Sequence, residues 1–182
     1  MTLFTTTLHM SYPSGFKYVC IHFSPPGFIH GDPNEQNILV QRKGDTSATS
    51  AGTDDTEYVV CGILDFQDAA CTHPLYDLAM VLAYVMLQAK TFDPLEVGGH
   101  ILAGYTSVLD LPTLERSLLK VCVAGRLVQS LVLGAYNHSL DPTNDYLLTT
   151  AQSGWHVLHA LWDTPADTVH SLWANIEQSY GK

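Results

Sequence analysis

The sequence predicts an α+β fold in which a β-rich first third is followed by segregated helices. Two short apolar segments, residues 38–41 and 58–66, have the length and the flanking turn residues of strands. From residue 74 onward, apolar residues recur at helical spacing. The chain has 182 residues, of which 46% are hydrophobic and 14% charged, so it is long and apolar enough for one packed domain. A hairpin followed by a run of helices is typical of the α+β class.

The two predicted strands are expected to pair as an antiparallel hairpin. The second contains the run YVVCGILDF, whose β-branched and aromatic residues favour a strand. Residues 42–57, between the strands, are dense in Gly, Ser, Thr and Asp, which predicts a mobile surface loop longer than the common hairpin turns. Residues 1–27 show no clear hydrophobic period, and we make no structural prediction for them.

Prolines and capping residues mark the expected helix starts. Pro74 is expected to open the first helix. Asp93 is expected to cap the second, with Pro94 at its first helical position. Gly98 and Gly99 are expected to weaken the second turn of that helix, because glycine is a poor helix former.

Three more helices are expected, over residues 113–136, over residues 144–162 and from Pro165 onward. The middle one is expected to break near Gly154, and Thr164 to cap the last.

Charge and cysteine content exclude several classes of protein. The net charge is −10, and no basic face is visible that would bind nucleic acid or an anionic membrane. The acidity fits a cationic substrate or metal ions, and it also fits plain solubility. Four cysteines without a C-x-x-C pair predict reduced, mostly buried thiols. No export or membrane signal is apparent, so we expect a cytoplasmic protein.

The segments HGDPNEQN, from His30 to Asn37, and ILDFQD, from Ile63 to Asp68, carry the chemistry. Phosphoryl transfer needs a carboxylate that orients and deprotonates the attacking hydroxyl, and oxygen ligands for Mg²⁺. If the hairpin forms, Asn37 begins one strand and Asp65 ends its neighbour, so one metal could bridge their side chains. Asp32 lies just upstream and is free to face a hydroxyl.

A second interpretation of these residues stays open. Asp and Asn at strand ends commonly serve as turn residues, and neither segment alone is specific. Their occurrence together, in this order around a hairpin, favours the catalytic interpretation.

The pattern H-G-D-x-x-x-x-N followed by I-L-D-F-x-D resembles the aminoglycoside phosphotransferase and choline kinase superfamily, which is related to the protein kinases. The resemblance implies that Asp32 is the catalytic base and that Asn37 and Asp65 hold Mg²⁺ and, through it, the nucleotide. It further implies that His30 braces the catalytic loop and that Asp68 supports the metal site or the substrate.

The segment HPLYDLA, residues 73–79, is similar to the P-x-x-D-L-A motif of that superfamily. The resemblance implies that Asp77 supports the catalytic loop from the start of a helix. Alternatively, Asp77 is a simple acidic residue in a first helical turn.

Two longer runs, NEQNILV at residues 34–40 and the segment 125–162, resemble the hydroxylysine kinases within that superfamily. The resemblance implies GTP-dependent (or ATP-dependent) phosphorylation of 5-hydroxy-L-lysine, an amino alcohol, in lysine degradation. It implies a protein-kinase-like C-terminal lobe over residues 28–182. Only one lysine, Lys17, and no glycine-rich loop precede His30, so we expect a truncated chain without the N-terminal lobe that grips the nucleotide.

Three functions therefore compete: a small-molecule kinase, a catalytically incompetent binding or regulatory module, and a metal-dependent hydrolase that uses the same acids. Other candidate residues are weaker. His156 and His159 have helical metal-ligand spacing but no third ligand nearby, so helix-surface or packing roles are expected. Arg126, inside an apolar helix, is either paired or in contact with substrate. The three tryptophans are expected to pack in the core: Trp155, Trp162 and Trp173.

Overall fold

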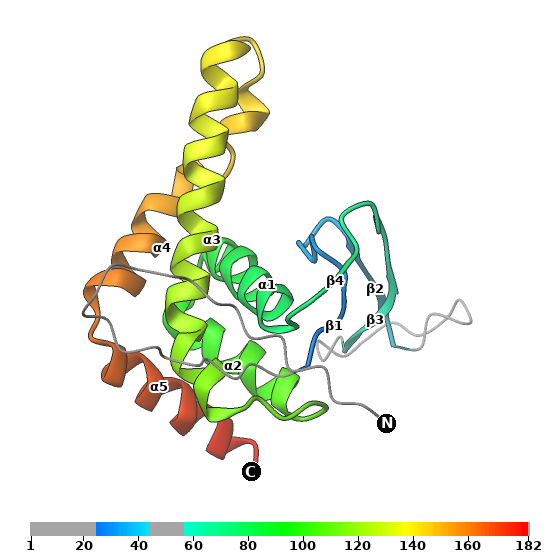
Figure 1. The fold of residues 1–182 in the computed structure, drawn as a ribbon, viewed down its shortest axis with the longest axis vertical. Helices are drawn as coiled ribbons and strands as arrows, with labels where there is room; N and C mark the ends of the chain where they lie inside the picture. Colours follow the sequence, from blue (N-terminus) through cyan, green and yellow to red (C-terminus); the bar gives the residue numbers. More distant parts are fainter. Residues whose placement is uncertain (1–24, 44–56, 182) are drawn as a thin grey trace, which may run out of the picture.

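The computed structural model describes residues 25–43 and 57–181, and Figure 1 shows strands followed by helices as predicted. The strands are β1 (Gly27–Ile29), β2 (Ile38–Arg42), β3 (Tyr58–Ile63) and β4 (Ala70–Thr72). The helices are α1 (Leu75–Gln88), α2 (Pro94–Thr106), α3 (Thr113–Leu140), α4 (Ala151–Asp163) and α5 (Ala166–Ser179), with a short 3₁₀ helix η1 (Asp145–Leu148) before α4. Most of the predicted mobile loop 42–57, and residues 1–24, lie outside the described residues.

The strands form two antiparallel pairs, which lie on one side of the helices (Figure 1). β2 pairs with β3 in the predicted hairpin, with Ile38 opposite Ile63. The predicted second strand is too long, because the chain leaves the β conformation at Asp65, whose φ is 61°. The other pair, β1 with β4, was not predicted. Each of its strands has three residues, too few to show a hydrophobic period.

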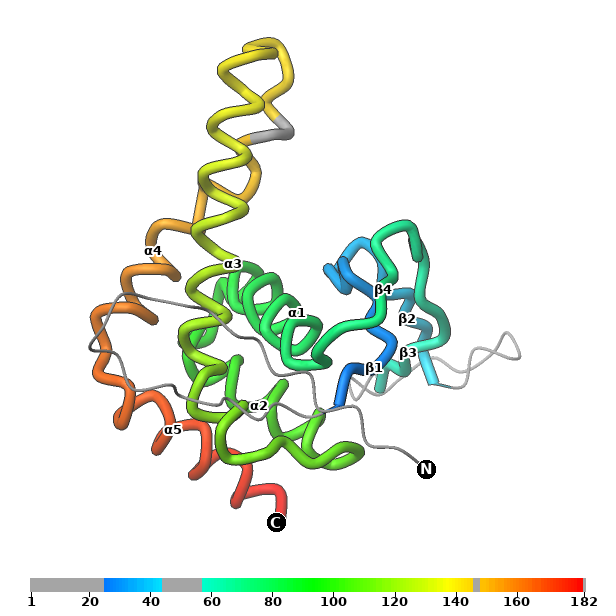
Figure 2. The backbone as a smooth tube through the Cα atoms, viewed as in Figure 1, coloured from blue at the N-terminus to red at the C-terminus, as the bar shows by residue number. Residues whose placement is uncertain are grey.

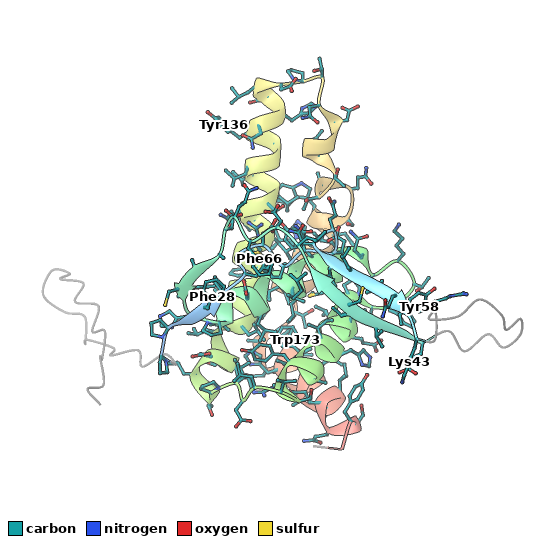
Figure 3. The ribbon with its side chains drawn as sticks, turned by 90° about the vertical axis from the view of Figure 1, so that its right-hand side faces the viewer. Phe28, Lys43, Tyr58, Phe66, Tyr136 and Trp173 are labelled. Carbon is teal, nitrogen blue, oxygen red and sulfur yellow. The ribbon has the colours of Figure 1, made fainter. Side chains whose placement is uncertain are left out.

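The helices enclose the hydrophobic core around α3, which packs against α1, α4 and α5 (Figure 2). Trp173 of α5 is 1% exposed at the centre of this core (Figure 3). The C-terminal half of α3 extends beyond the other helices before the chain returns through η1 (Figure 1). By length and composition α3 could cross a membrane, and 33% of its most apolar stretch is buried inside the protein. Core helices of globular proteins meet the same criteria.

Helix α2 begins as predicted, and two glycines in its second turn do not interrupt it. The carboxylate of Asp93 accepts a hydrogen bond from the backbone N–H of Leu95 at 2.8 Å, and Pro94 is the first helical residue. The helix continues through Gly98 and Gly99, both of which are buried. A Cβ atom at Gly99 would lie 2.6 Å from Cδ1 of Ile176, so the missing side chains permit close packing of α2 on α5. The predicted weak turn therefore does not interrupt the helix, and the close packing offsets the low helix propensity of glycine.

The predicted break within residues 144–162 lies at residues 149–150, between η1 and α4, and not near Gly154. Gly154 is buried in the first turns of α4, and a Cβ atom there would lie 2.8 Å from Cδ2 of Leu131. Thr164 does not cap α5 either. Its hydroxyl donates to the carbonyl of Ala160 at 2.7 Å, and Pro165 occupies the N-cap position without a side-chain bond. Both errors come from small residues whose contacts lie elsewhere: Gly154 packs against Leu131 of α3, and Thr164 bonds within α4.

Exposed apolar and sulfur-bearing side chains correct two further expectations. Cys61 and Cys71 are exposed and Cys122 is half-buried, so the described thiols are not mostly buried. Trp155 and Trp162 are also exposed, and of the tryptophans only Trp173 is a core residue.

Candidate active site

The loop that joins β1 to β2 holds Asp32 through a network of local hydrogen bonds. The carbonyl of Asp32 accepts hydrogen bonds from the backbone N–H of Asn34 at 2.9 Å and from the side-chain amide of Asn37 at 3.0 Å. Its Oδ2 accepts from Nδ2 of Asn34 at 2.8 Å. Its Oδ1 is buried and has no hydrogen-bond partner among the described residues. The loop therefore fixes one carboxylate oxygen of Asp32 and leaves the other for a further partner.

His30 joins this loop to the one that carries Asp65. Its Nδ1 accepts a hydrogen bond from the backbone N–H of Asp32 at 3.3 Å, and its Nε2 lies 2.8 Å from the carbonyl of Leu64. A carbonyl can only accept, so Nε2 donates in this contact. The ring also packs on Phe66, with 4.7 Å between the ring centroids. His30 thus contacts both segments singled out in the sequence.

Asp77, in the first turn of α1, binds the backbone at the start of the same loop. Its carboxylate accepts hydrogen bonds from the backbone N–H groups of His30 at 2.6 Å and Gly31 at 2.9 Å. Bonds from N–H groups to an ionised acceptor are about twice as strong as neutral ones. This geometry supports the loop-bracing role implied for Asp77 over the role of a simple helix-end charge.

Asn37 and Asp65 lie at the same end of the β2–β3 hairpin. The carbonyl of Asn37 accepts a hydrogen bond from the backbone N–H of Leu64 at 2.8 Å, and Asp65 follows immediately. The side-chain nitrogen of Asn37 is committed to the carbonyl of Asp32, so its Oδ1 is the group available to a ligand. Oδ1 of Asp65 accepts weakly from the backbone N–H of Gln67 at 3.4 Å, which leaves Oδ2 exposed.

These two side chains fit Mg²⁺ by their chemistry. Both offer hard oxygen atoms, and Mg²⁺ takes few protein ligands while it keeps water and phosphate oxygens. Asp65 also adopts a left-handed φ of 61°, a strained conformation of the kind found at ligand sites. Within the described ranges, no group of three or more His, Cys, Asp or Glu side chains forms a metal site. Binding of Mg²⁺ by Asn37 and Asp65 stays a prediction.

Gly31 and Asp68 bring the two loops into backbone contact. Gly31 has a φ of 90°, and a Cβ atom there would lie 2.1 Å from the carbonyl oxygen of Asp68. Only glycine fits this position, which explains the glycine of the H-G-D segment. The side chain of Asp68 is exposed. Its predicted support of metal or substrate stays a prediction.

A pocket of about 330 Å³ opens beside Asp32, between the β1–β2 loop and helices α1, α3 and α4. Its lining includes Tyr84 of α1, which the sequence did not single out, and Arg126 of α3, for which the sequence left open a paired role and a substrate contact. The guanidinium of Arg126 lies 3.7 Å from Oδ1 of Asp32 and donates to the hydroxyl of Tyr84 at 2.6 Å. A charged residue inside an apolar helical run was the one available signal. His156 and His159 lie outside this pocket and are exposed.

Comparisons with known proteins agree with this geometry. The profile of the phosphotransferase enzyme family matches residues 22–111, which contain both motifs and Asp77. The chain is 41% identical to hydroxylysine kinase from Bos taurus over 152 residues, and 38% identical to that from Xenopus laevis over the same length. These alignments cover 83% of this chain but only 38% and 39% of the two relatives. No solved structure matches the chain significantly.

The chain thus spans well under half the length of the relatives that it matches. Residues 22–111 are a phosphotransferase-family domain, and the chain is a homologue of the hydroxylysine kinases over 83% of its length.

Proposed function

We propose that residues 28–182 form the acceptor-binding, C-terminal lobe of a small-molecule kinase that phosphorylates a hydroxyl group. The observation that carries the proposal is the arrangement of Asp32. Its loop holds it rigidly, its Oδ1 accepts no hydrogen bond from the described residues and lies beside a pocket, and Asn37 and Asp65 lie at the adjacent hairpin end. Such positioning supplies most of the catalysis in phosphoryl transfer.

In this proposal Asp32 orients the acceptor hydroxyl and takes its proton. The hydroxyl oxygen forms a bond to the γ-phosphorus while the bond from that phosphorus to the bridging oxygen breaks, and the nucleoside diphosphate leaves. His30 and Asp77 keep the loop in place during the step through their bonds to its backbone. Mg²⁺, when held by Asn37 and Asp65, neutralises charge on the phosphoryl oxygens.

The relatives' name supports 5-hydroxy-L-lysine as the acceptor. We propose GTP as the donor, with ATP as the alternative. The pocket volume of about 330 Å³ is at the small end for ligand sites, which suits an acceptor of amino-acid size.

A second function remains open, a binding or regulatory module without catalysis. The observation that favours it is apolar surface on the strands and the loop after them. Figure 3 shows Phe28 and Phe66 on this side of the molecule. The exposed apolar side chains here are Phe28, Leu39, Val40, Tyr58, Val60, Ile63, Leu64 and Phe66. A lobe that docks on another domain or protein would expose such a surface when alone.

Calorimetric titration of the purified chain with Mg·GTP, combined with product analysis, separates these functions. The kinase proposal expects binding and the formation of phosphorylated hydroxylysine. Absence of binding and turnover supports a lobe that cannot act alone or the non-catalytic module. Phosphate release at the same rate without a hydroxyl acceptor supports the hydrolase and contradicts the kinase. Light scattering adds a further check, because a chain that stays monodisperse at high concentration weakens the single-lobe proposal.

A further inference from the structure

The pocket beside Asp32 contains one positively charged side chain, that of Arg126, whose hydrogen-bonding capacity is only partly used. Among the described residues that line it, Arg126 alone is cationic, and Asp32 and Glu35 are anionic. The other lining groups include neutral hydroxyls and amides, such as Ser130 and Gln88. The pocket therefore combines one guanidinium with two carboxylates.

The guanidinium is held firmly by neutral groups. It donates to the hydroxyl of Tyr84 at 2.6 Å and to Oε1 of Gln129 at 2.9 Å, and it lies 5.2 Å from the centroid of the Tyr84 ring. These contacts fix the plane of the arginine but carry no negative charge. The Asp32 carboxylate forms an ion pair with it at 3.7 Å, without a hydrogen bond.

Its remaining hydrogen-bonding capacity is not used by the described residues. The Nε–H is buried and has no acceptor, and Oδ1 of Asp32 lies 3.7 Å from Nη2, beyond hydrogen-bond distance. A buried, unpaired donor costs free energy, and a ligand that pairs with it recovers that cost. Carboxylates match the fork of a guanidinium in geometry and charge.

We infer that Arg126 binds the carboxylate of the acceptor, so that the pocket selects hydroxyl-bearing amino acids over amino alcohols that lack a carboxylate. The inference rests on the proposed function for the identity of the acceptor. A ligand with one carboxylate and two ammonium groups also complements the charges of the lining. The carbon chain between its carboxylate and its hydroxyl lets one molecule reach both Arg126 and Asp32, which are neighbours in the pocket.

The test is calorimetric binding of two acceptors to the full chain without nucleotide: 5-hydroxy-L-lysine and its carboxamide, which lacks the negative charge. Arg126→Gln is expected to weaken binding of the acid by about 10- to 100-fold, the loss of a charged hydrogen-bonded pair, and of the amide by less than about threefold. Arg126→Lys should restore only part of the affinity, because lysine lacks the fork.

Two matched variants exclude indirect effects. Tyr84→Phe keeps the ring but removes the hydroxyl that positions Arg126, so it should weaken binding of the acid alone, by less than Arg126→Gln. Lys90→Gln removes an exposed positive charge outside the pocket lining and should change neither affinity. Circular dichroism and thermal unfolding check that each variant is folded.

Equal weakening of acid and amide by Arg126→Gln, unchanged binding of both, or no binding of either acceptor to the folded wild-type chain would overturn the inference. So would a loss of Mg·GTP affinity with acceptor affinity unchanged, which would assign Arg126 to the phosphoryl group. The failure of the proposed function is distinguishable. Carboxylate-selective binding without phosphoryl transfer supports this inference and contradicts the kinase function. Phosphoryl transfer that Arg126→Gln weakens equally for both acceptors supports the kinase function and contradicts this inference.

Discussion

The carboxylate of Asp77 accepts hydrogen bonds from two successive backbone N–H groups, that of His30 at 2.6 Å and that of Gly31 at 2.9 Å. This pair connects the first turn of α1 to the loop that carries Asp32. The catalytic loop therefore rests on the helical core, and not only on the small sheets that flank it.

Asp77→Ala is expected to lower the free energy of unfolding by about 2–4 kcal/mol, because two partly buried N–H groups lose a charged acceptor. Hydrogen exchange of residues 30–37 should accelerate in the same variant. The matched control is Asp167→Ala, which removes an exposed acid from the first turn of α5 and should cost no more than about 1 kcal/mol. Equal losses in both variants would mean that Asp77 is only a helix-end charge.

Asp65 combines a ligand's position with a left-handed backbone. Asp65→Gly and Asp65→Ala should both raise the Mg²⁺ concentration needed for half-maximal turnover, since each removes the carboxylate. The glycine variant should be more stable than the alanine variant by about 1 kcal/mol, because glycine adopts this φ without strain. Metal titrations of activity and urea unfolding measure the two effects separately. An unchanged Mg²⁺ requirement would remove Asp65 from the metal site.

Gly99→Ala should destabilise the protein by about 1–3 kcal/mol, because the added Cβ atom would meet Ile176 at 2.6 Å. Gly104→Ala is the control within the same helix. A Cβ atom there has nothing within 4 Å, so the substitution should stabilise α2 by up to about 1 kcal/mol. Chemical denaturation measures both. Stabilisation by Gly99→Ala would show that α2 and α5 are not packed as described.

Tyr105 is expected to make the free energy of unfolding depend on pH in the alkaline range. Burial, and then the charges of Glu115 and Asp77, raise the pKa of its phenol above the ordinary 10.0. Above that pH the unfolded chain loses the proton while the folded state still keeps it. This contribution to stability is therefore complete below about pH 10 and falls as the pH rises through the folded-state pKa.

Tyr105→Phe should remove that part of the pH dependence. Urea unfolding of both proteins between about pH 8 and pH 11 measures it, with the difference between the two curves as the readout. Parallel curves would show that the surroundings of Tyr105 do not favour the neutral phenol.

The parts of the fold that depend on local sequence could be predicted. The β2–β3 pairing follows from two runs of β-branched and apolar residues, and the start of α2 follows from Asp93 and Pro94. The strands β1 and β4 could not be predicted in this way. They are only three residues long and depend on their pairing with each other.

The candidate site likewise combines features set by local sequence with features set by contacts between distant segments. The positions of Asn37 and Asp65 at one hairpin end follow from local pattern, although their binding of Mg²⁺ stays a prediction. The approach of Arg126 to Asp32 depends on how α3 packs against α1, which no short-range pattern encodes. Gly99 shows the converse, since a local rule against glycine was outweighed by a contact with a distant helix.

The most direct test of the central claim measures phosphoryl transfer from Mg·GTP to 5-hydroxy-L-lysine in a chimera. This chain replaces the matching 152-residue segment of the hydroxylysine kinase from Bos taurus, so the rest of that protein is present. We expect the chimera to form phosphorylated hydroxylysine, and Asp32→Asn to lower its turnover by about 10²- to 10⁴-fold with Mg·GTP binding retained. A folded Asp32→Asn chimera that turns over at the unsubstituted rate would contradict this expectation.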